Sequence, residues 1–350
     1  MQKSIDVVVI GGGYFANFQI NAWLRLTGVN LVAIVEPDTS KHDALKEKIS
    51  LYSSNHTLIT RTLTSAVHDN KITIVDIATP PSSHAALITQ AVALECPYII
   101  CQKPFCDTYS SAKEVYEKTK DSASTIVVHE NFRFQPWFRA IKAKLEKEPI
   151  GTVLQATFRL RPGDGQGSDA YLERQPYFRE MDKFLIHETG VHYIDVFRYL
   201  FGEPLALTAE LQRLNPAIKG EDAGYFIFNY PSGLRVRFEG NRLLDHAADN
   251  TRLTMGEMLI EGTHGSIALF GNGDLLLRHF GETQWHKIMY SFDDNDFGGD
   301  CVYHIQKHII DHLQLNTPLE NRIEDYLRNL ELETLIYKAA TTQTRLECNV

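Results

Sequence analysis

The chain has 350 residues, about two domains by the usual size of a domain, with 43% hydrophobic and 23% charged residues. A chain of this size and composition can bury a large core, which excludes a small disulfide-stapled scaffold. Lys and Arg number 35 against 44 Asp and Glu, so the net charge is −9, and no basic stripe is present. Nucleic-acid binding needs clustered cations that neutralise phosphates, and it is therefore not expected.

The five cysteines form no CxxC pair. An odd number of cysteines in a chain without a signal peptide predicts a reducing, cytoplasmic setting. The apolar run near the N-terminus is short and ends in glycines, and no apolar stretch reaches the roughly 20 residues of a membrane helix. We expect neither membrane association nor a metal site.

The first 130 residues alternate short β-branched runs with helical patterns. Predicted strands cover 5–10, 30–36, 72–78, 98–101 and 124–128, and predicted helices lie near 16–27, 40–50, 82–95 and 108–120. Buried strands that alternate with helices are typical of βαβ units and a parallel sheet. The sequence therefore predicts an α/β dinucleotide-binding domain of the Rossmann type over residues 1–130.

The pattern changes after Gly151. Predicted strands lie near 152–160, 205–213, 223–230, 233–241, 252–262, 265–270 and 274–280, with helices at 184–201 and about 300–342. Turn residues join the successive strands, which favours antiparallel pairing. Residues 131–350 are therefore expected to form an α+β domain with a mostly antiparallel open sheet.

The first predicted strand runs into a glycine-rich turn with the pattern GxGxxA. Gly11 permits the tight turn, Gly13 lets the backbone approach a pyrophosphate, and Ala16 lets the helix pack closely on the strand. The pyrophosphate would lie at the helix N-terminus, where N–H groups and the helix dipole favour anions. The residues expected to bind the cofactor in this turn are Gly11, Gly13, Tyr14, Phe15 and Ala16.

Glu36 ends the second predicted strand, 25 positions after Gly11. A carboxylate there can bind both ribose hydroxyls and would repel a 2′-phosphate. We therefore expect NAD rather than NADP.

Two further strand ends point to the same site, because ligands of open α/β sheets bind beyond the carboxyl ends of the strands. Thr79 and Pro80 follow the third long strand and are expected beside the nicotinamide. His84 opens the next helix and is either a cofactor contact or a structural histidine. Lys103 follows the fourth, before a proline that favours an extended backbone, and it is either a site residue or a surface lysine.

The predicted helix over 184–201 carries a polar stripe. Glu188, His192, Asp195 and Tyr199 share one helical face by their spacing. On a helix this apolar, such a stripe favours a lined cavity, although a salt-bridged surface would give the same pattern. Histidine is a suitable base for an alcohol proton near neutral pH, and a neighbouring carboxylate can orient it.

With these segments the chain resembles the Gfo/Idh/MocA family of nicotinamide-dependent oxidoreductases over nearly its whole length. The resemblance rests on GGGYFA at 11–16, ATPPSSH at 78–84, QKP at 102–104, ENFRFQPWFR at 130–139 and HETGVHYIDVFRYLFGEP at 187–204. It implies a Rossmann domain, a C-terminal domain with an open sheet, and homodimers or homotetramers. Within the family the chain is most similar to aldose-oxidising members such as the apiose dehydrogenases.

The resemblance also implies roles for individual residues. Lys103 matches the lysine beside nicotinamide and substrate, and Gln102 stands where the family has Glu, which loses a charge next to the cofactor. His192 matches the catalytic histidine. Glu188 stands where the family usually has Asp, four residues earlier, and Asp195 matches an acid one turn later that orients the site or binds a substrate hydroxyl.

Polar groups beside an aromatic ring follow the fifth long strand and suit a polyol. The residues expected to bind substrate are Lys103, Asn131, Arg133, Trp137, Glu188, His192 and Asp195. Some of the residues after the strand could instead anchor the domain interface.

The sequence thus predicts an NAD-dependent dehydrogenase that acts on a CH–OH group of a sugar or polyol. His192 would accept the hydroxyl proton while hydride passes to the nicotinamide, Lys103 would hold the substrate oxygen, and Glu188 would orient His192. The alternatives are a nucleotide-binding regulator of the same fold without catalysis, and a family oxidoreductase with a non-sugar substrate.

Overall fold

The computed structural model describes residues 4–52, 57–67 and 71–348. The chain divides into two compact units. The first contains Met1–Asn131 and Val302–Arg328, and the second contains Phe132–Cys301 and Asn329–Val350. The sequence assigned 131–350 to one domain, whereas the structure groups 302–328 with the first unit. Across the described ranges, no helix has both the length and the apolar character needed to cross a membrane.

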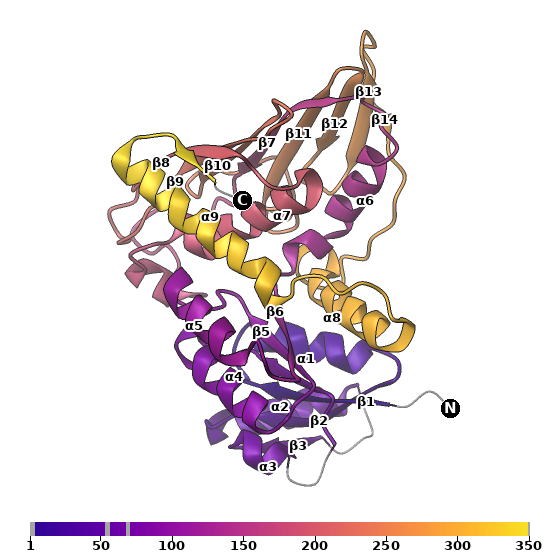
Figure 1. Cartoon of the computed structure of the whole chain (residues 1–350), viewed down its shortest axis with the longest axis vertical. Helices are drawn as coiled ribbons and strands as arrows, with labels where there is room; N and C mark the ends of the chain where they lie inside the picture. Colours follow the sequence, from indigo (N-terminus) through magenta and orange to yellow (C-terminus); the bar gives the residue numbers. More distant parts are fainter. Residues whose placement is uncertain (1–3, 53–56, 68–70, 349–350) are drawn as a thin grey trace. The chain divides into compact units, whose positions relative to one another are not determined.

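The first unit is built on a six-stranded sheet (Figure 1). Its strands are β1 (Ile5–Ile10), β2 (Val29–Val35), β3 (Leu58–Thr60), β4 (Ile74–Ile77), β5 (Tyr98–Gln102) and β6 (Thr125–His129). Every pairing is parallel, and the order is β3-β2-β1-β4-β5-β6. This order is that of a Rossmann sheet, which confirms the predicted fold class.

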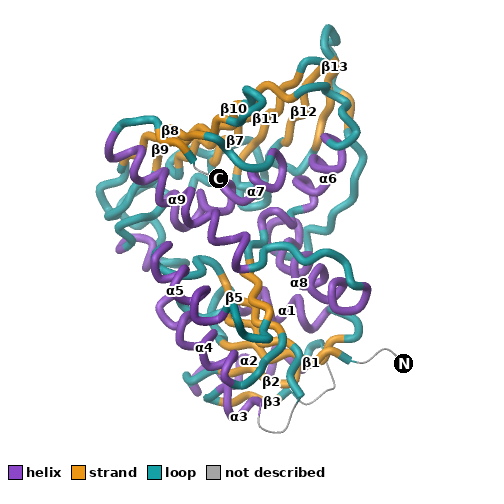
Figure 2. The backbone as a smooth tube through the Cα atoms, in the orientation of Figure 1, coloured by secondary structure: helices purple, strands orange, loops and turns teal. Residues whose placement is uncertain are grey.

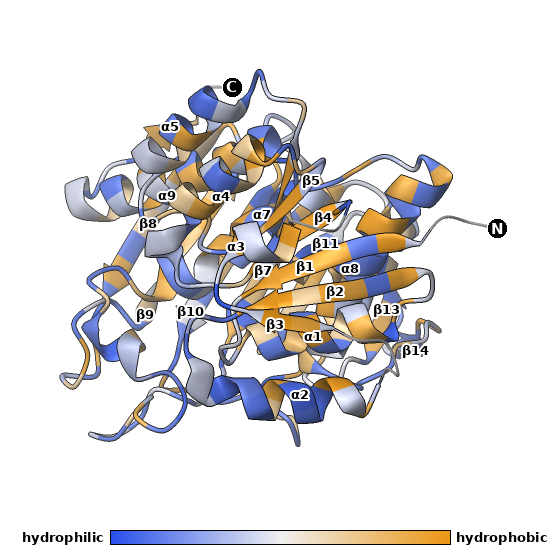
Figure 3. Cartoon of the chain, turned by 90° about the horizontal axis from the view of Figure 1, so that it is seen from below, coloured by the Kyte–Doolittle hydropathy of each residue, from blue (hydrophilic) through white to orange (hydrophobic). Residues whose placement is uncertain are grey.

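In the described parts of the connections, five α-helices follow one another: α1 (Ala16–Arg25), α2 (His42–Ser50), α3 (Leu63–Val67), α4 (His84–Ala93) and α5 (Tyr109–Thr119). Strands β1 and β4 are almost wholly buried, and Figure 3 shows apolar residues along β1 and β2 and polar ones on α2. Short 3₁₀ turns precede α2 and α4 at Thr39–Lys41 and Pro81–Ser83. Neither β3 nor α3 was predicted, because each is too short to show a periodicity.

The segment 302–328 completes the first unit at the β6 edge. The backbone N–H of Val128 donates to the carbonyl of Asn321 at 2.8 Å, and the side-chain amide of Asn321 donates to the carbonyl of Glu130 at 2.7 Å. The hydroxyl of Tyr326 donates to the Glu130 carboxylate at 3.2 Å. Late residues of the chain therefore satisfy polar groups of an early strand.

The second unit is built on a nine-stranded sheet in the order β14-β13-β12-β11-β7-β10-β9-β8-β15. Its strands are β7 (Val153–Leu160), β8 (Ala206–Gln212), β9 (Ala223–Asn229), β10 (Arg235–Asn241), β11 (Gly256–Gly262), β12 (Gly265–Leu269), β13 (Leu275–His279), β14 (His286–Lys287) and β15 (Leu346–Glu347). Only the β10–β7 pair is parallel among these strands. The predicted mostly antiparallel sheet is confirmed.

Three helices lie along one face of this sheet, as Figure 2 shows: α6 (Pro136–Leu145), α7 (Val191–Phe201) and α9 (Ile323–Thr342). Helix α8 spans Phe297–Leu315, and its residues from Val302 onward belong to the first unit. Inward-facing side chains alternate along β7 and β10, and they pack against α7. Phe158, Phe226 and Phe238 meet Tyr193 and Phe197 in this core. The alternation on the strands and the apolar face of α7 thus create one core.

The predicted helix over 184–201 differs in its first turns. Residues Leu185–Gly190 form a π-helical turn, η5, and the α-helix begins only at Val191. The Glu221 carboxylate accepts the N–H groups of Phe184 and Ile186, both at 3.2 Å, at the start of this turn. Such wide turns often occur at functional sites, because they change the direction in which side chains point.

Candidate functional site

The glycine-rich turn of the first unit joins β1 to α1. Gly11 has a φ of +114°, and a Cβ atom there would lie 2.7 Å from the carbonyl oxygen of Ala78. A Cβ on Gly13 would meet no atom within 4 Å. Gly11 is therefore required by the turn itself, whereas Gly13 borders open space through which a ligand can reach the backbone.

The helix that follows this turn starts without a side-chain cap at Phe15 and without an acidic side chain in its first turn. Ala16 is buried, in keeping with close packing of α1 on the sheet. The Tyr14 ring is 46% exposed and packs edge-on against Phe18. An N-terminus of this kind favours an anion, since the helix dipole is not neutralised there.

Glu36 lies just beyond β2 and is 5% exposed. Its carboxylate accepts the backbone N–H of Gly12 at 2.8 Å and that of Asp38 at 2.9 Å. The ammonium of Lys41 lies 3.5 Å from the oxygen that binds Gly12. A carboxylate has about four acceptor positions, so these contacts fix Glu36 and leave room for ribose hydroxyls. The residues present therefore fit a dinucleotide whose ribose carries free hydroxyls.

Thr79 and Pro80 follow β4, as predicted, at the carboxyl edge of the sheet. The Thr79 hydroxyl pairs with that of Ser83 at 2.7 Å. His84 is fully buried, and its ring nitrogens contact the carbonyl oxygens of Thr79 and Phe105 at 2.8 and 3.1 Å. Burial lowers the pKa of His84. These contacts favour the structural interpretation of His84, because the ring links the segments that follow β4 and β5.

Lys103 follows β5 at the same edge, and its peptide bond to Pro104 is cis. The side-chain oxygen of Gln102 accepts the backbone N–H of Lys103 at 2.6 Å. The nitrogen of the same amide group, Nε2, is buried without a hydrogen-bond partner among the described residues. Gln102 therefore fixes the backbone of Lys103 through its Oε1, and its Nε2 group is available to donate a hydrogen bond to a ligand.

The second unit carries the remaining predicted residues on η5 and α7. His192 occupies the first turn of α7 and is 3% exposed. Its ring stacks on Phe132, with centroids 3.7 Å apart and planes inclined by 3°. This stacking fixes the plane of the imidazole from one side.

Glu188 lies on η5, and its side chain is 15% exposed. Its carboxylate accepts the hydroxyl of Thr189 at 2.6 Å and lies 3.9 Å from the guanidinium of Arg242. The predicted pair of acid and histidine thus spans the junction between a π-helical turn and an α-helix. The angle around the helix axis between Glu188 and His192 therefore differs from the angle between residues i and i+4 of a regular α-helix.

Asp195 is 1% exposed and bound from two sides. It accepts two hydrogen bonds from Arg133, at 2.7 and 2.6 Å, and one from Asn329 at 2.7 Å. Trp137 is fully buried, and its indole donates to Gln135 at 3.0 Å. Three residues that were expected to bind substrate therefore bind other side chains of the second unit: Asp195, Arg133 and Trp137. The ring of Trp137 has no exposed face on which a sugar could stack. Asn131, at the end of the first unit, is also 1% exposed.

Two residues of the second unit were not predicted, although both contact a predicted one. Arg242 and Thr189 surround Glu188, and Arg242 is 1% exposed despite its charge. The sequence offered only a weak signal, an arginine in a segment after β10 that otherwise reads as a loop. The contact depends on tertiary packing, which periodicity does not report.

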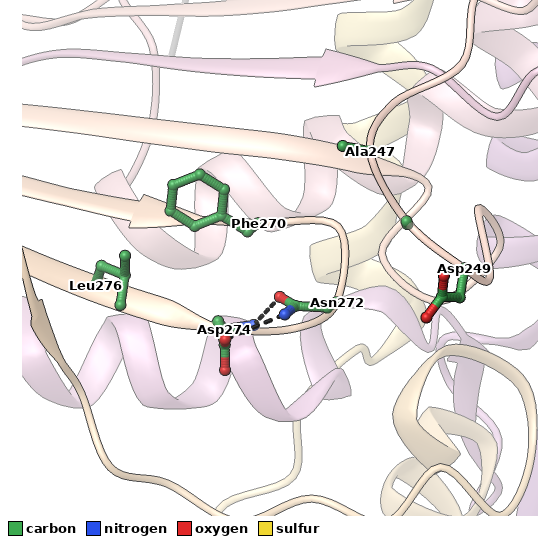
Figure 4. A pocket seen from close by; sticks show the side chains of 7 residues that line it. Ala247, Asp249, Phe270, Asn272, Asp274 and Leu276 are labelled. Atoms are coloured by element: carbon green, nitrogen blue, oxygen red, sulfur yellow. Dashed lines mark hydrogen bonds between the residues drawn. The ribbon is translucent and has the colours of Figure 1, made fainter.

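A pocket of about 600 Å³ opens elsewhere in the second unit (Figure 4). Its walls come from the loop at 247–249 and the β12–β13 hairpin, and Asp249, Asn272 and Asp274 provide its polar groups. None of the predicted site residues lines it. Within the described ranges, no group of three or more His, Cys, Asp or Glu side chains could hold a metal ion.

Comparisons with known proteins place this geometry in a family. Residues 5–130 match the oxidoreductase family with an NAD-binding Rossmann fold, and residues 138–268 match the Gfo/Idh/MocA C-terminal domain. The chain is 29% identical to a D-apiose dehydrogenase of Rhizobium rhizogenes over 350 aligned residues, covering 95% of this chain and 94% of that protein.

Solved structures agree with this similarity. An oxidoreductase from Agrobacterium radiobacter, in complex with NAD+, L-tartaric acid and magnesium, has a TM-score of 0.85 and 26% identity, over 99% of both chains. Levoglucosan dehydrogenase, in complex with NADH and levoglucosan, has a TM-score of 0.79 at 19% identity, over 99% of this chain and all of the other, which supports the fold alone. The glycine-rich turn, the fold of both units and the two matched regions agree, and the chain belongs to the Gfo/Idh/MocA family of oxidoreductases with an NAD-binding Rossmann fold.

Proposed function

We propose that this oxidoreductase oxidises a CH–OH group of a sugar or polyol with NAD, and that Lys103, Glu188 and His192 carry the chemistry. The placement of Glu188 on the π-helical turn that runs directly into the first turn of α7, where His192 lies, is the observation that carries the proposal. The D-apiose dehydrogenase that aligns over 95% of the chain supports the substrate class.

The cofactor residues of the proposal are those of the first unit. The turn of Gly11 and Gly13 and the N-terminus of α1 would hold the pyrophosphate, and Glu36 would bind the ribose hydroxyls. Thr79, Pro80 and Gln102, at the carboxyl edge of the sheet, would border the nicotinamide. When bound, NAD supplies the acceptor for the hydride that leaves the substrate carbon.

The protein's own groups manage the proton and the charge on oxygen. An imidazole nitrogen of His192 would accept the hydroxyl proton as the carbinol becomes a carbonyl. The Lys103 ammonium would donate a hydrogen bond to the substrate oxygen and stabilise its negative charge as the proton leaves. Glu188 would orient His192 and stabilise the imidazolium. Phe132 supports the opposite face of that ring.

Two further properties belong to the proposal. The second copy of a homodimer or homotetramer would use the face of the nine-stranded sheet opposite α6, α7 and α9. Each of the five cysteines is a buried thiol outside any disulfide, which supports a reducing, cytoplasmic location.

The test is NAD reduction, followed at 340 nm, across pentoses, hexoses, inositols and branched aldoses, with NADP in parallel. We expect reduction with at least one aldose or polyol and higher catalytic efficiency with NAD. Higher efficiency with NADP would contradict the role of Glu36. NAD binding without turnover on any sugar would instead favour a regulator or a non-sugar substrate.

A further inference from the structure

We propose that Arg242 is a positioning residue for the reaction and acts through the hydroxyl of Thr189 to fix the carboxylate of Glu188. This inference rests on the proposed function, in which Glu188 orients His192. Arg242, Thr189 and Glu188 all belong to the second unit. The inference therefore depends only on contacts within that unit.

Arg242 is almost completely buried, which is unusual for a charged side chain. Asp164 accepts hydrogen bonds from its Nε at 3.1 Å and its Nη2 at 2.7 Å. The guanidinium carbon lies 4.6 Å from the ring centroid of Phe184, 5.3 Å from Tyr171 and 5.4 Å from Phe178. One carboxylate and three aromatic rings thus hold the guanidinium in a single orientation.

The third nitrogen of the guanidinium, Nη1, donates to the Thr189 hydroxyl at 2.8 Å. Arginine can only donate, so the hydroxyl oxygen must accept this bond. The single hydroxyl hydrogen of Thr189 is then directed to Glu188, 2.6 Å away. The two hydrogen bonds form a relay whose direction is fixed by the chemistry of its members, and such relays strengthen each bond by polarisation.

The same contacts disfavour another role for a buried arginine, which is the capture of an anionic substrate. Nε donates to Tyr171 at 3.0 Å as well as to Asp164, while Nη1 donates to Thr189 and Nη2 to Asp164. All three nitrogens therefore face protein acceptors. Asp164 pairs with this guanidinium and also with that of Arg174. One carboxylate thus serves two cations, and Nη1 of Arg242 lies 3.9 Å from the Glu188 carboxylate, which it attracts without a direct hydrogen bond.

Several titratable or charged groups share this environment, and a pH profile must be interpreted with all of them. They are Asp164, Tyr171, Arg174, Tyr177, Glu188, Asp222 and Arg242. Burial raises the pKa of Tyr171 above its ordinary value. This phenol is therefore not expected to titrate in the pH range of the assay.

The test removes the hydroxyl and leaves the arginine in place. Substitution of Arg242 would leave Asp164 without its buried cation, and such variants often fail to fold. Thr189→Val has nearly the same shape but cannot relay the bond, whereas Thr189→Ser keeps the hydroxyl. Each variant is measured for kcat and KM across pH, for NAD affinity by protein fluorescence, and for thermal stability.

We expect Thr189→Val to lower kcat by about tenfold, the scale of one hydrogen bond to a charged group, without a change in NAD affinity. A well-placed carboxylate favours the protonated imidazole, so its displacement should move the acidic limb of the kcat/KM profile to lower pH. Thr189→Ser should restore the wild-type limb. A purely structural role of Thr189 would lower thermal stability in Thr189→Val and leave the limb in place, which would overturn the proposal.

Glu188→Gln separates this inference from the proposed function. If Glu188→Gln moves the limb and Thr189→Val does not, the relay is rejected and the role of Glu188 stands. If Glu188→Gln leaves both rate and limb unchanged, the role of Glu188 and the relay fall together. If both variants move the limb and Thr189→Ser does not, the relay is supported.

Discussion

The cofactor end of the first unit and the acid–histidine end of the second unit are built in different ways. In the first unit the backbone defines the site: a positive φ at Gly11, a bare helix N-terminus, and two N–H groups that hold Glu36. In the second unit side chains do this, with Phe132 against His192 and Thr189 and Arg242 around Glu188.

This difference has a consequence for substitutions. A backbone-defined site depends on a few glycines and on the strand order, so it responds to changes in conformation. A side-chain network depends on the shape and charge of each member. Substitutions in the first kind of site should change stability or cofactor binding, whereas those in the second kind should lower the rate while cofactor binding persists.

The largest expected effect sharpens this contrast in the second unit. His192→Ala should lower kcat by roughly 10²–10⁴-fold, the usual contribution of a general base, with NAD affinity unchanged. Steady-state kinetics and a fluorescence titration with NAD measure the two quantities. His279→Ala, at an exposed position of β13, is the matched control. A His192→Ala enzyme with the wild-type rate would reject the proposed base.

The next effect concerns the core of the first unit. Asp76 is fully buried and accepts hydrogen bonds only from Gln19 and Trp23 among the described residues, at 2.8 and 2.7 Å. Burial raises the pKa of Asp76 to about 7. The folded state then keeps a proton that the unfolded state loses near pH 4, so this residue's contribution to stability falls as the pH rises from about 4 to 7.

Asp76→Asn abolishes this titration. Relative to wild type, the variant should gain stability from pH 4 to pH 8, by up to roughly 4 kcal/mol if the whole shift is expressed. Denaturant unfolding at both pH values measures the change. Asp43→Asn on exposed α2 is the control, because a surface ion pair contributes little. A constant difference between Asp76→Asn and wild type at both pH values would contradict the buried-carboxyl interpretation.

The smallest effect tests whether the glycine-rich turn separates conformation from ligand approach. Gly11→Ala forces a Cβ against the Ala78 carbonyl at a positive φ and should destabilise the protein by about 1–3 kcal/mol. Gly13→Ala meets no protein atom and should leave stability unchanged while weakening NAD binding. Thermal unfolding and NAD titration of both variants are decisive. Equal loss of stability in the two would show that the contrast between them is false.

The sequence predicted most of the fold because long periodic segments determine it. The strand Ile5–Ile10 was placed without error, and the strands of the second sheet lay within a few residues of their observed bounds. Four of the misses, β3, β14, β15 and α3, have between two and five residues each and show no period. The fifth is α6 (Pro136–Leu145), which has 10 residues and lies at the predicted boundary between the two domains. The π-helical turn at Leu185–Gly190 was also missed, since a helical pattern does not distinguish the two kinds of helix.

The parts of the candidate site that the backbone defines were easier to predict than the parts that side-chain contacts define. Glycine spacing predicted the turn, and the structure has Glu36, Thr79 and Lys103 at the strand ends where the sequence placed them. The partners of Asp195 and Glu188 were beyond reach, because Asn329 and Arg242 are distant in the sequence and are brought near only by packing. The sequence thus predicts the chemical role of a side chain, but it does not predict which distant side chains will bind it.

The discontinuous first unit has a consequence for biosynthesis. Its sheet leaves the ribosome early, but the residues that pair with β6 and satisfy Glu130 are Asn321 and Tyr326. The whole stretch from Phe132 to Cys301 must be synthesised before that segment emerges. The dinucleotide-binding unit, although its sheet is synthesised first, is therefore completed only after residues 132–301 of the second unit.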